Sequence, residues 1–257
     1  MNNKTTKQIM NSYRLKLVLV SFAYLIALGA LIALTSYSLL LGLGGVVVLA
    51  LSVRTPFEKI RETELERVIF DELDPCKFQE LIDLGAFKNS KRHKVLCAVS
   101  LGEYEKALDI IENQRAKKEH PVDMCNDLYR KGYIYFEKGE FDKLPAIIKE
   151  YEALKKKHPQ FVPTFNNFTV FDKFDAFADE DYEYVVDVCD IDLKEINPKA
   201  QNYKVTKINV GFYRAVSLYK LGKFDEAKEG FEAIIEFAPK MHKAKLAREY
   251  ISLIEKA

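Results

Sequence analysis

The four histidines and four cysteines are the residues of this chain best suited to metal binding or nucleophilic catalysis. They are spread singly: no two cysteines have a C-x-x-C spacing, and no histidine has a partner at metal-ligand spacing. The acidic group from Asp179 to Asp187 lacks the central glycine and alternating ligands of an EF-hand loop. A phosphate-cradling glycine loop, a G-x-S-x-G elbow and an H-E-x-x-H pair are also absent from the sequence. The sequence therefore predicts no catalytic residue, no metal site and no cofactor.

The cysteines and histidines have simpler structural interpretations. Each cysteine lies in or beside an apolar helical pattern, so we expect small buried hydrophobes in a reducing compartment, with a disulfide framework as the alternative. His120 and His158 precede prolines at the basic ends of expected helices, where a cation complements the helix dipole. These positions predict surface capping instead of catalysis.

Charge divides the chain into two parts. Residues 1–53 contain four bases, Lys4, Lys7, Arg14 and Lys16, and no acid, whereas the remainder is close to neutral. Neither part has the strongly basic face of a nucleic-acid-binding domain. The sequence therefore predicts no nucleic-acid partner.

Two apolar runs near the N-terminus have the length of membrane-spanning helices. Leu17 to Leu34 carries no charge and would extend about 27 Å as a helix, close to the hydrocarbon thickness of a bilayer. After Thr35–Ser38, a second run continues to Val53. We predict a basic N-terminus over residues 1–16 and two transmembrane helices within 17–54, at about 17–35 and 37–54. A cleaved signal peptide followed by one anchor is the alternative.

The positions of the bases predict the orientation of this hairpin. Basic residues precede the first run and follow the second, at Arg54, Lys59 and Arg61, whereas the connecting loop is uncharged. We expect both termini and residues 55–257 on the cytoplasmic side of a bacterial inner membrane. The glycines of the second run would pack the two spans together or, alternatively, form a dimerisation face.

A turn signature occurs three times in the remaining sequence. Each copy has a glycine, an aromatic residue two positions later and a small or medium apolar residue three positions after that. These residues are Gly102, Tyr104 and Ala107; Gly139, Phe141 and Leu144; and Gly222, Phe224 and Ala227. Glycine after an apolar-periodic segment indicates a left-handed helix end, and the pattern resumes as a second helix. An acidic turn at Glu180, with Tyr182 in the aromatic position, completes a predicted array of four helical hairpins.

We expect only helices after residue 54. They are predicted at 57–72, 75–85, 90–101, 104–118, 122–138, 141–157, 164–178, 181–195, 201–221, 224–237 and 240–256. Thr55 and Pro56 have the residue types of a helix N-cap and first position. The last helix is expected to cap the array, with Ala244 and Ala247 inward and Lys243 and Lys245 outward. The fold class is all-α, a transmembrane hairpin followed by an α-solenoid.

The repeated pattern resembles the tetratricopeptide repeat. The last copy is the most similar, with Ala215, Gly222, Phe224, Ala227 and Pro239 at the offsets of the family signature. The resemblance covers about residues 75–257, but the spacing between turns exceeds the family's period of about 34 residues. It implies a helical solenoid that binds other proteins.

The resemblance also implies a concave groove lined by the first helix of each hairpin. The candidate groove residues are Arg92, Tyr129, Tyr133, Phe136, Phe174, Phe177, Phe212 and Tyr219. An aromatic groove suits an extended or helical peptide. The alternative for each ring is packing in the core.

These observations predict a membrane-anchored scaffold for protein–protein interactions. Its partners would be another protein or peptide and, through residues 17–54, membrane lipid. A co-chaperone-like receptor for a peptide or client is an alternative, and an enzyme with an unrecognised site is an alternative of another class. The oligomeric state and the identity of the partner stay open.

Overall fold

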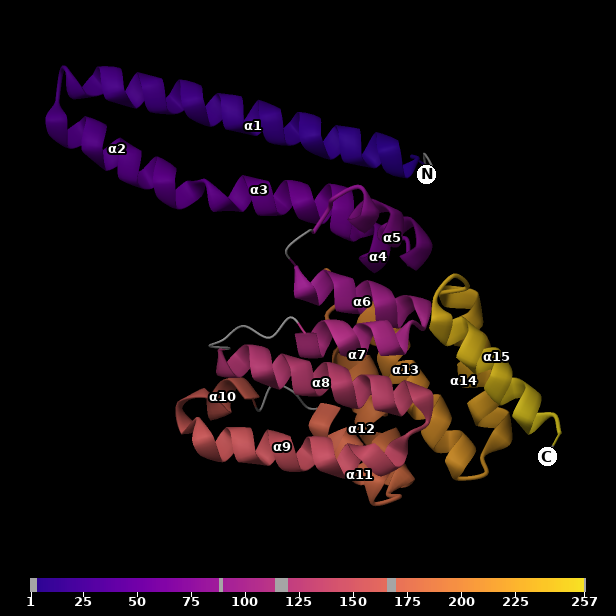
Figure 1. Ribbon diagram of the computed structural model, residues 1–257. Helices are drawn as coiled ribbons and strands as arrows, with labels where there is room; N and C mark the ends of the chain where they lie inside the picture. Colours follow the sequence, from indigo (N-terminus) through magenta and orange to yellow (C-terminus); the bar gives the residue numbers. More distant parts are fainter. Residues whose placement is uncertain (1–3, 88–89, 114–119, 166–169, 257) are drawn as a thin grey trace. The chain divides into compact units, whose positions relative to one another are not determined.

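The computed structural model describes residues 4–87, 90–113, 120–165 and 170–256, and the regular elements in these ranges are all helical (Figure 1). The all-α prediction is confirmed for this part of the chain. The chain divides into two compact units, residues 1–88 and residues 89–257. The sequence placed a boundary at residue 54 instead. The difference arises because helices that follow residue 54 pack against the first helix of the chain.

Helix α1 (Thr6–Thr35) begins about ten residues before the predicted membrane span. Thr5 caps it: the Thr5 hydroxyl accepts from the Gln8 backbone N–H at 3.3 Å, and the Gln8 side chain accepts from the Thr5 N–H at 2.9 Å. This reciprocal pair satisfies two backbone donors and fixes the helix start. Ile9 and Met10 on the added turns are buried, so the basic N-terminal segment is part of unit 1.

Helix α2 (Leu39–Ser52) runs beside α1, and its glycines explain the close packing. A Cβ on Gly42 would lie 2.2 Å from the Thr35 side chain, and one on Gly45 would lie 2.4 Å from Leu31, whereas a Cβ on Gly44 would meet nothing within 4 Å. Two of the three glycines therefore serve contact within the hairpin, as one of the two sequence interpretations predicted.

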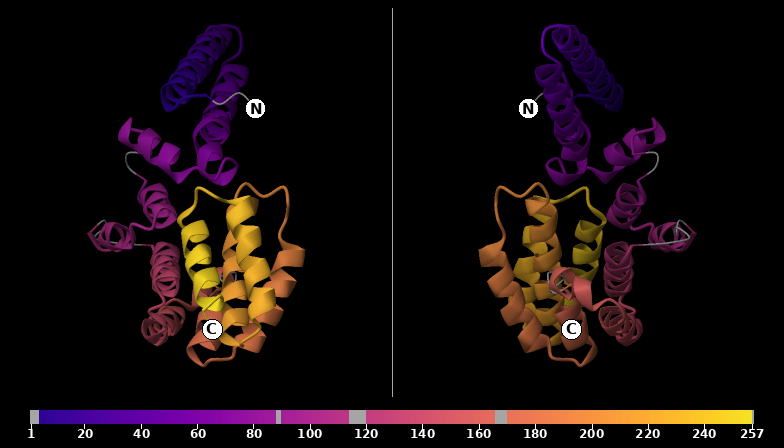
Figure 2. Two further views of the ribbon diagram at one scale, coloured as in Figure 1. Left: turned by 90° about the vertical axis from the view of Figure 1, so that its right-hand side faces the viewer. Right: turned by 90° about the vertical axis from the view of Figure 1, so that its left-hand side faces the viewer.

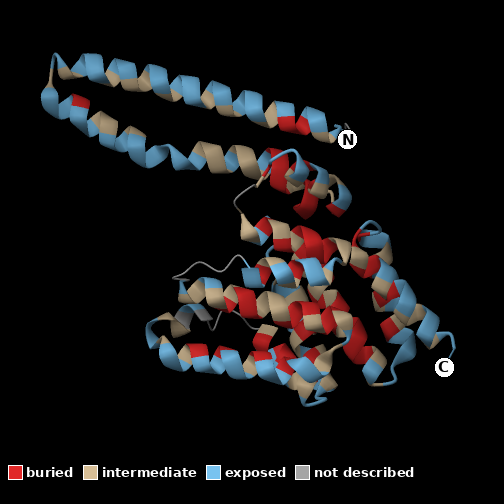
Figure 3. Ribbon diagram, in the orientation of Figure 1, coloured by how far each residue is buried: buried red, intermediate tan, exposed pale blue. Residues whose placement is uncertain are grey.

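Much of α1 and α2 is exposed (Figure 3), and the exposed side chains include many large apolar ones. By length and composition, α1 and the helical run Leu39–Phe70 are each able to cross a membrane, although signal sequences and some core helices pass the same test. The exposed large apolar side chains include Leu19, Phe22, Leu25, Leu40 and Leu51.

An ion pair joins the second half of unit 1 to α1. The second half consists of α3 (Arg54–Arg61), a π-helical turn η1 (Glu62–Glu66), α4 (Arg67–Phe70) and α5 (Pro75–Asp83). Glu64 forms an ion pair with Lys16 of α1, and within the second half Arg61 pairs with Glu66 at 2.9 Å. Burial opposes ionisation of Glu64, but hydrogen bonds from Lys16 and Ser12 outweigh it, so the pKa of Glu64 is lowered. Glu64 is therefore charged at neutral pH.

The expected helix start at Thr55 is wrong. Helix α3 begins at Arg54 with Val53 in helical geometry and without a side-chain cap. The helical backbone continues almost directly from α2, so Thr55 has no free helix end to cap.

Unit 2 is an array of helical hairpins, whose later helices lie side by side in Figure 2. Its elements agree with most of the predicted bounds. They are α6 (Lys91–Leu101), α7 (Tyr104–Asn113), α8 (Pro121–Lys138), η2 (Phe141–Lys143), α9 (Leu144–Lys157), η3 (Pro159–Phe161), α10 (Val162–Phe165), α11 (Val170–Ala178), α12 (Tyr182–Glu195), α13 (Tyr203–Lys220), α14 (Phe224–Phe237) and α15 (His242–Ile254). The expected helix 164–178 is described in two parts, α10 and α11, and residues 166–169 lie outside the described residues.

All four predicted turns have the same hydrogen-bond geometry. At Gly102, Gly139, Glu180 and Gly222 the backbone φ is positive, at 79°, 73°, 60° and 72°. In each turn this residue donates to the carbonyl three residues back, and the next residue donates to the carbonyl five residues back. This is the Schellman pattern that ends a helix with a left-handed residue. The acidic turn is therefore a structural copy of the glycine turns, as predicted.

Replacing Glu180 with glycine should stabilise unit 2. A side chain in the left-handed region costs about 1 kcal/mol, which glycine avoids, although its greater freedom in the unfolded chain offsets part of the gain. Urea unfolding of the full chain in detergent, followed by circular dichroism, measures the change. Gly222→Ala is the matched control and should destabilise; an equal loss from Glu180→Gly would contradict this account of the turn.

The small-residue position of each hairpin is fully buried. Ala107, Leu144, Val185 and Ala227 each have no exposed surface and lie on the first turns of the second helices. Of the aromatic residues between the helices, Phe141 contacts Phe136 and Phe177 at ring-centroid distances of 5.4 and 4.6 Å, and Tyr182 contacts Phe177 at 4.9 Å. The sequence signature thus corresponds to the contact between paired helices.

Candidate functional site

The structure buries five of the eight predicted groove residues. Tyr133, Phe136, Phe174, Phe177 and Phe212 are at most 8% exposed. Three of these rings contact Tyr213 of α13, with centroid distances of 4.3 Å from Phe136 and 6.1 Å from both Tyr133 and Phe174. The expectation that the five line an open groove is wrong, because first helices of different hairpins bury one another's aromatic faces and Phe212 packs against Phe231 and Tyr250.

The other three predicted groove residues do not form one site. Arg92 is exposed on α6, Tyr129 is half-buried beside Tyr133, and Tyr219 is half-buried between Phe224 and Tyr250, at centroid distances of 5.7 and 5.2 Å. None of the eight residues lines either of the two cavities described below.

Helix α15 places a buried cation in the aromatic core. Lys243, predicted to point outward, is only 5% exposed; its ammonium forms an ion pair with Glu137 of α8 and a hydrogen bond with the Tyr133 hydroxyl. It also lies over the Tyr133 ring, 4.2 Å from the centroid. The outward orientation of Lys243 is therefore corrected, whereas Ala244 and Ala247 are fully buried as predicted. Helix α15 is a packed element of the core that contacts α6, α13 and α14.

Two tyrosines complete this buried polar cluster. The Tyr104 hydroxyl donates to Glu137 at 2.9 Å, and the Tyr133 hydroxyl donates to the Asn209 side chain at 2.5 Å. Burial raises the pKa of Glu137 to about 8, and burial lowers the pKa of Lys243 well below its ordinary range. Shifted pKa values can mark catalytic groups, but these side chains have almost no exposed surface to offer a substrate. The cluster therefore serves packing between α15 and α8.

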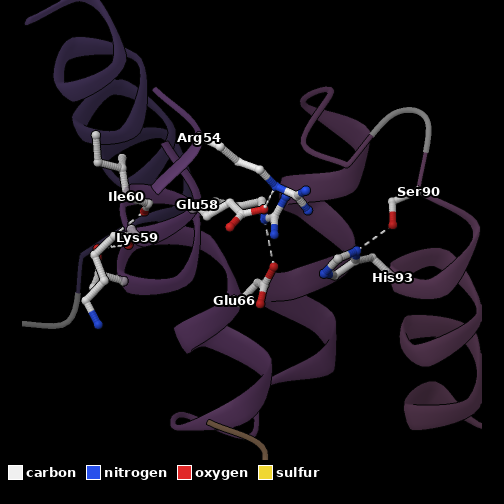
Figure 4. Close-up of polar contacts among 9 residues, drawn as sticks. Arg54, Glu58, Lys59, Ile60, Glu66, Ser90 and His93 are labelled. Carbon is white, nitrogen blue, oxygen red and sulfur yellow. Dashed lines mark hydrogen bonds and ion pairs between the residues drawn. The ribbon is translucent and has the colours of Figure 1, made fainter. Parts of the chain in front are cut away.

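Two histidines and three of the four cysteines have structural positions in the described residues. His93 is buried and hydrogen-bonds Ser90 at 2.6 Å (Figure 4), and His120 caps the start of α8, not the end of a helix as expected. Cys97, Cys125 and Cys189 are buried free thiols as predicted, whereas Cys76 is exposed. Burial raises the pKa of Cys125 and of Cys189 to about 12, so neither is a thiolate nucleophile near neutral pH.

An open groove lies elsewhere on unit 2, between α12, α13 and α14. Its cavity volume is about 690 Å³. Helix α13 is the middle one of these three helices in the sequence, and α12 and α14 each pack against it. It is lined by Asp190, Leu193, Lys207, Ile208, Gly211, Arg214, Gly230, Ala233, Ile234, Glu236 and Phe237. A smaller hollow of about 300 Å³ shares Arg214, Gly230 and Ala233 and adds Glu226 and Glu229. We refer to the two together as the α12–α14 groove.

The α12–α14 groove combines apolar surface with charge. Arg214 of α13 donates a hydrogen bond to Asp190 of α12 at 2.6 Å. The Lys207 ammonium lies 5.4 Å from the centre of the Phe237 ring. Phe237 itself is 41% exposed. A concave apolar surface with a few polar groups is typical of a binding site. Such a groove can hold a side chain of a partner, but it contains no nucleophile with an adjacent base.

Sequence reasoning missed this groove because it assigned the binding surface to the opposite stripe of α13. Phe212 and Tyr219 belong to the predicted stripe, whereas Lys207, Gly211 and Arg214 recur at spacings of four and three on another face. The available signal was Gly211, a glycine in the interior of an expected helix.

The family model described as Tetratricopeptide repeat matches residues 210–240. The matched segment contains most of α13, all of α14 and the turn at Gly222. This match supports a tetratricopeptide-like relationship for the chain, in agreement with the helical hairpins of unit 2. Comparison with curated proteins gave no match, and comparison with solved structures gave none either.

Proposed function

We propose that this protein is a membrane-anchored scaffold for protein–protein interactions. In this proposal unit 2 binds another protein, and helices within residues 17–54 hold it at a membrane. The observation that carries the proposal is the repeated hairpin: four turns have one hydrogen-bond pattern, and the last lies inside the tetratricopeptide match. Stacked hairpins of this kind present extended surfaces that bind other proteins.

The membrane part of the proposal is supported by the exposed surface of α1 and α2. Large apolar side chains cover these helices, and a soluble protein rarely exposes so continuous an apolar surface. The loop between the helices carries no charge, whereas bases lie at the other end of the hairpin. We propose that this basic end and unit 2 face the cytoplasm of a bacterial cell.

Cysteine labelling in intact bacterial cells tests the proposed topology. Ser36→Cys, in the loop between α1 and α2, should react with a membrane-impermeant maleimide added outside. Lys256→Cys, near the C-terminus, should react only after the cells are opened, because it would lie in the cytoplasm. Labelling of Lys256→Cys from outside would overturn the orientation, and recovery of the full chain in the soluble fraction would overturn the anchor.

Photocrosslinking in native membranes tests the scaffold function. A photoreactive residue is placed at Phe237 in the α12–α14 groove, at Tyr219 and, as a control on exposed α15 surface, at Lys245. A scaffold should give at least one dominant protein adduct from Phe237 or Tyr219 that the Lys245 control does not give. An absence of such an adduct, at normal expression and after crosslinking of a known complex in the same membranes, would argue against the function.

A client receptor that uses the predicted concave groove is less well supported. Such a receptor needs open aromatic rings, and the rings that were expected to bind a client are buried against Tyr213 and α15. The proposal therefore assigns binding to surfaces outside that aromatic core.

A further inference from the structure

We propose that the α12–α14 groove binds a short basic segment of a partner protein. An apolar side chain of that segment would lie over Gly211, and a lysine or arginine beside it would face Glu226, Glu229 or Glu236. This inference rests on the proposed interaction function and specifies the chemistry of the partner at one surface.

Gly211 is the first observation. Glycine inside a helix is destabilising relative to alanine, so a helix-interior glycine usually has a local reason. A Cβ on Gly132 would lie 2.5 Å from the Phe174 ring, and one on Gly230 would lie 3.1 Å from the Ala215 Cβ. A Cβ on Gly211 would meet nothing within 4 Å, and its φ is not positive. Neither packing nor backbone geometry within the chain requires glycine there.

The space over Gly211 is therefore available to a ligand. Ile208 and Ile234 lie beside it in the lining, and Phe237 exposes part of its ring at one end. Ile191, next to Asp190 on α12, is also 53% exposed. Burial of an aliphatic or aromatic side chain against these groups would favour binding, because it removes apolar surface from water.

The charges of the lining are the second observation. Carboxylates outnumber cations by two among the residues that line the α12–α14 groove. Asp190 is paired with Arg214, and the Lys207 ammonium lies over an aromatic ring. Among the residues that the structure describes, Glu226, Glu229 and Glu236 have no ion-pair partner. The unbalanced charge is therefore negative.

Charge complementarity selects a basic partner. Glu226 and Glu229 lie near the turn that joins α13 and α14, and Glu236 lies near the other end of α14. A cation at either end would approach a carboxylate while an adjacent apolar side chain enters the groove. Exposed ion pairs contribute little to affinity, so the carboxylates mainly set specificity and association rate.

Peptide selection tests the proposed chemistry. The full chain in lipid nanodiscs is screened against random short peptides displayed on phage, with counter-selection against the Gly211→Leu variant. Peptides that bind the wild type and not the variant should combine a lysine or arginine with a neighbouring apolar residue. An acidic consensus would overturn the proposal, and so would the absence of any peptide that depends on Gly211.

Binding of one selected synthetic peptide, followed by fluorescence anisotropy, then measures the contributions. Glu226→Lys with Glu229→Lys should weaken binding about tenfold and reduce its salt dependence, because two attractive pairs become repulsive. The control is Asp225→Lys with Glu232→Lys, an equal charge change on α14 at exposed residues outside the lining. Equal effects of the two double variants would show that binding depends on net charge alone and would overturn the site.

Two controls separate folding and self-association from ligand binding. Gly211→Leu should unfold at the same temperature as the wild type or slightly above, since free space surrounds the position; Gly211→Ala should retain most binding.

If light scattering shows a dimer that Gly211→Leu converts to a monomer, the occupant is a second copy of this chain and the proposal is wrong. Protein adducts from Tyr219 without any groove-dependent peptide would preserve the scaffold function and overturn only this inference.

Discussion

Replacing Lys243 with methionine should lower the free energy of unfolding of unit 2 by about 3–5 kcal/mol. Methionine keeps most of the side-chain volume but leaves Glu137 without the ammonium that it contacts in the core. Removing one partner of a buried ion pair is costly because the other group keeps its desolvation penalty. Urea unfolding of the detergent-solubilised full chain, followed by circular dichroism, measures the loss.

The same variant should acquire a dependence of stability on pH. Without Lys243, Glu137 is still a buried carboxyl, so its folded-state pKa stays raised above the ordinary value of 4.5. At a pH between the unfolded and the raised folded-state pKa, the folded chain holds a proton that the unfolded chain has lost, so the free energy of unfolding falls as pH rises, by about 1.4 kcal/mol per pH unit. In the wild type, Glu137 and Lys243 together hold one proton near neutral pH in both the folded and the unfolded chain. The contribution of the pair to the free energy of unfolding therefore changes little between pH values of about 5 and 8.

Two comparisons make this prediction specific. Lys245→Met changes a lysine on the same helix whose side chain is 68% exposed, and it should alter the stability by less than about 0.5 kcal/mol. Glu137→Leu in the Lys243→Met background removes both buried polar groups and should recover much of the loss and abolish the new pH dependence. A Lys243→Met chain as stable as the Lys245→Met chain would contradict the buried position of α15.

Replacing Phe174 with alanine should cost about 3–5 kcal/mol of the stability of unit 2. The ring is fully buried and contacts Phe171 and Tyr213, each at a centroid distance of 6.1 Å. Its removal leaves a cavity between α8, α11 and α13 that these helices can close only in part. A groove-lining ring would behave differently, since its loss would weaken partner binding and leave stability nearly unchanged.

Gly132 provides an internal check on the Phe174 prediction. The Phe174 ring lies in the space that a Cβ on Gly132 would need, at 2.5 Å. Gly132→Leu alone should therefore destabilise by about 1–3 kcal/mol through overpacking, but in the Phe174→Ala background it should fill the cavity and recover part of the loss. Tyr184→Ala, at an exposed position on α12, is the control and should have little effect. Additive losses at Gly132 and Phe174 would contradict direct packing between them.

The turns and helices of unit 2 were predictable from the sequence because their signals are local. Glycine marks a left-handed helix end wherever the chain turns, and an apolar stripe with a period of 3.6 residues marks a helix. These rules located the turns at Gly102, Gly139 and Gly222, and the spacing between them located the glycine-free turn at Glu180. The family match over residues 210–240 supports the same assignment.

The membrane hairpin was predicted from composition, and its position in a membrane stays a prediction. What the local pattern missed in unit 1 was the length of α1, because residues 6–16 are polar and basic. A capping box at Thr5 and contacts of Ile9 and Met10 within the unit make this segment helical.

Tertiary structure decided which helical faces are open and which are closed. The apolar stripe of α8 does not show whether a ligand or another helix covers it, and α15 contacts it from more than 100 residues away along the chain. Lys243 looked like a surface lysine because its partner Glu137 is distant in sequence. The role of Gly211 likewise depends on the tertiary structure, because α12, α13 and α14 leave space above it. The sequence by itself determined the hairpins, their turns and an apolar N-terminal pair of helices. The burial of the predicted groove residues and the presence of the α12–α14 groove depend on contacts between distant segments, which local periodicity does not encode.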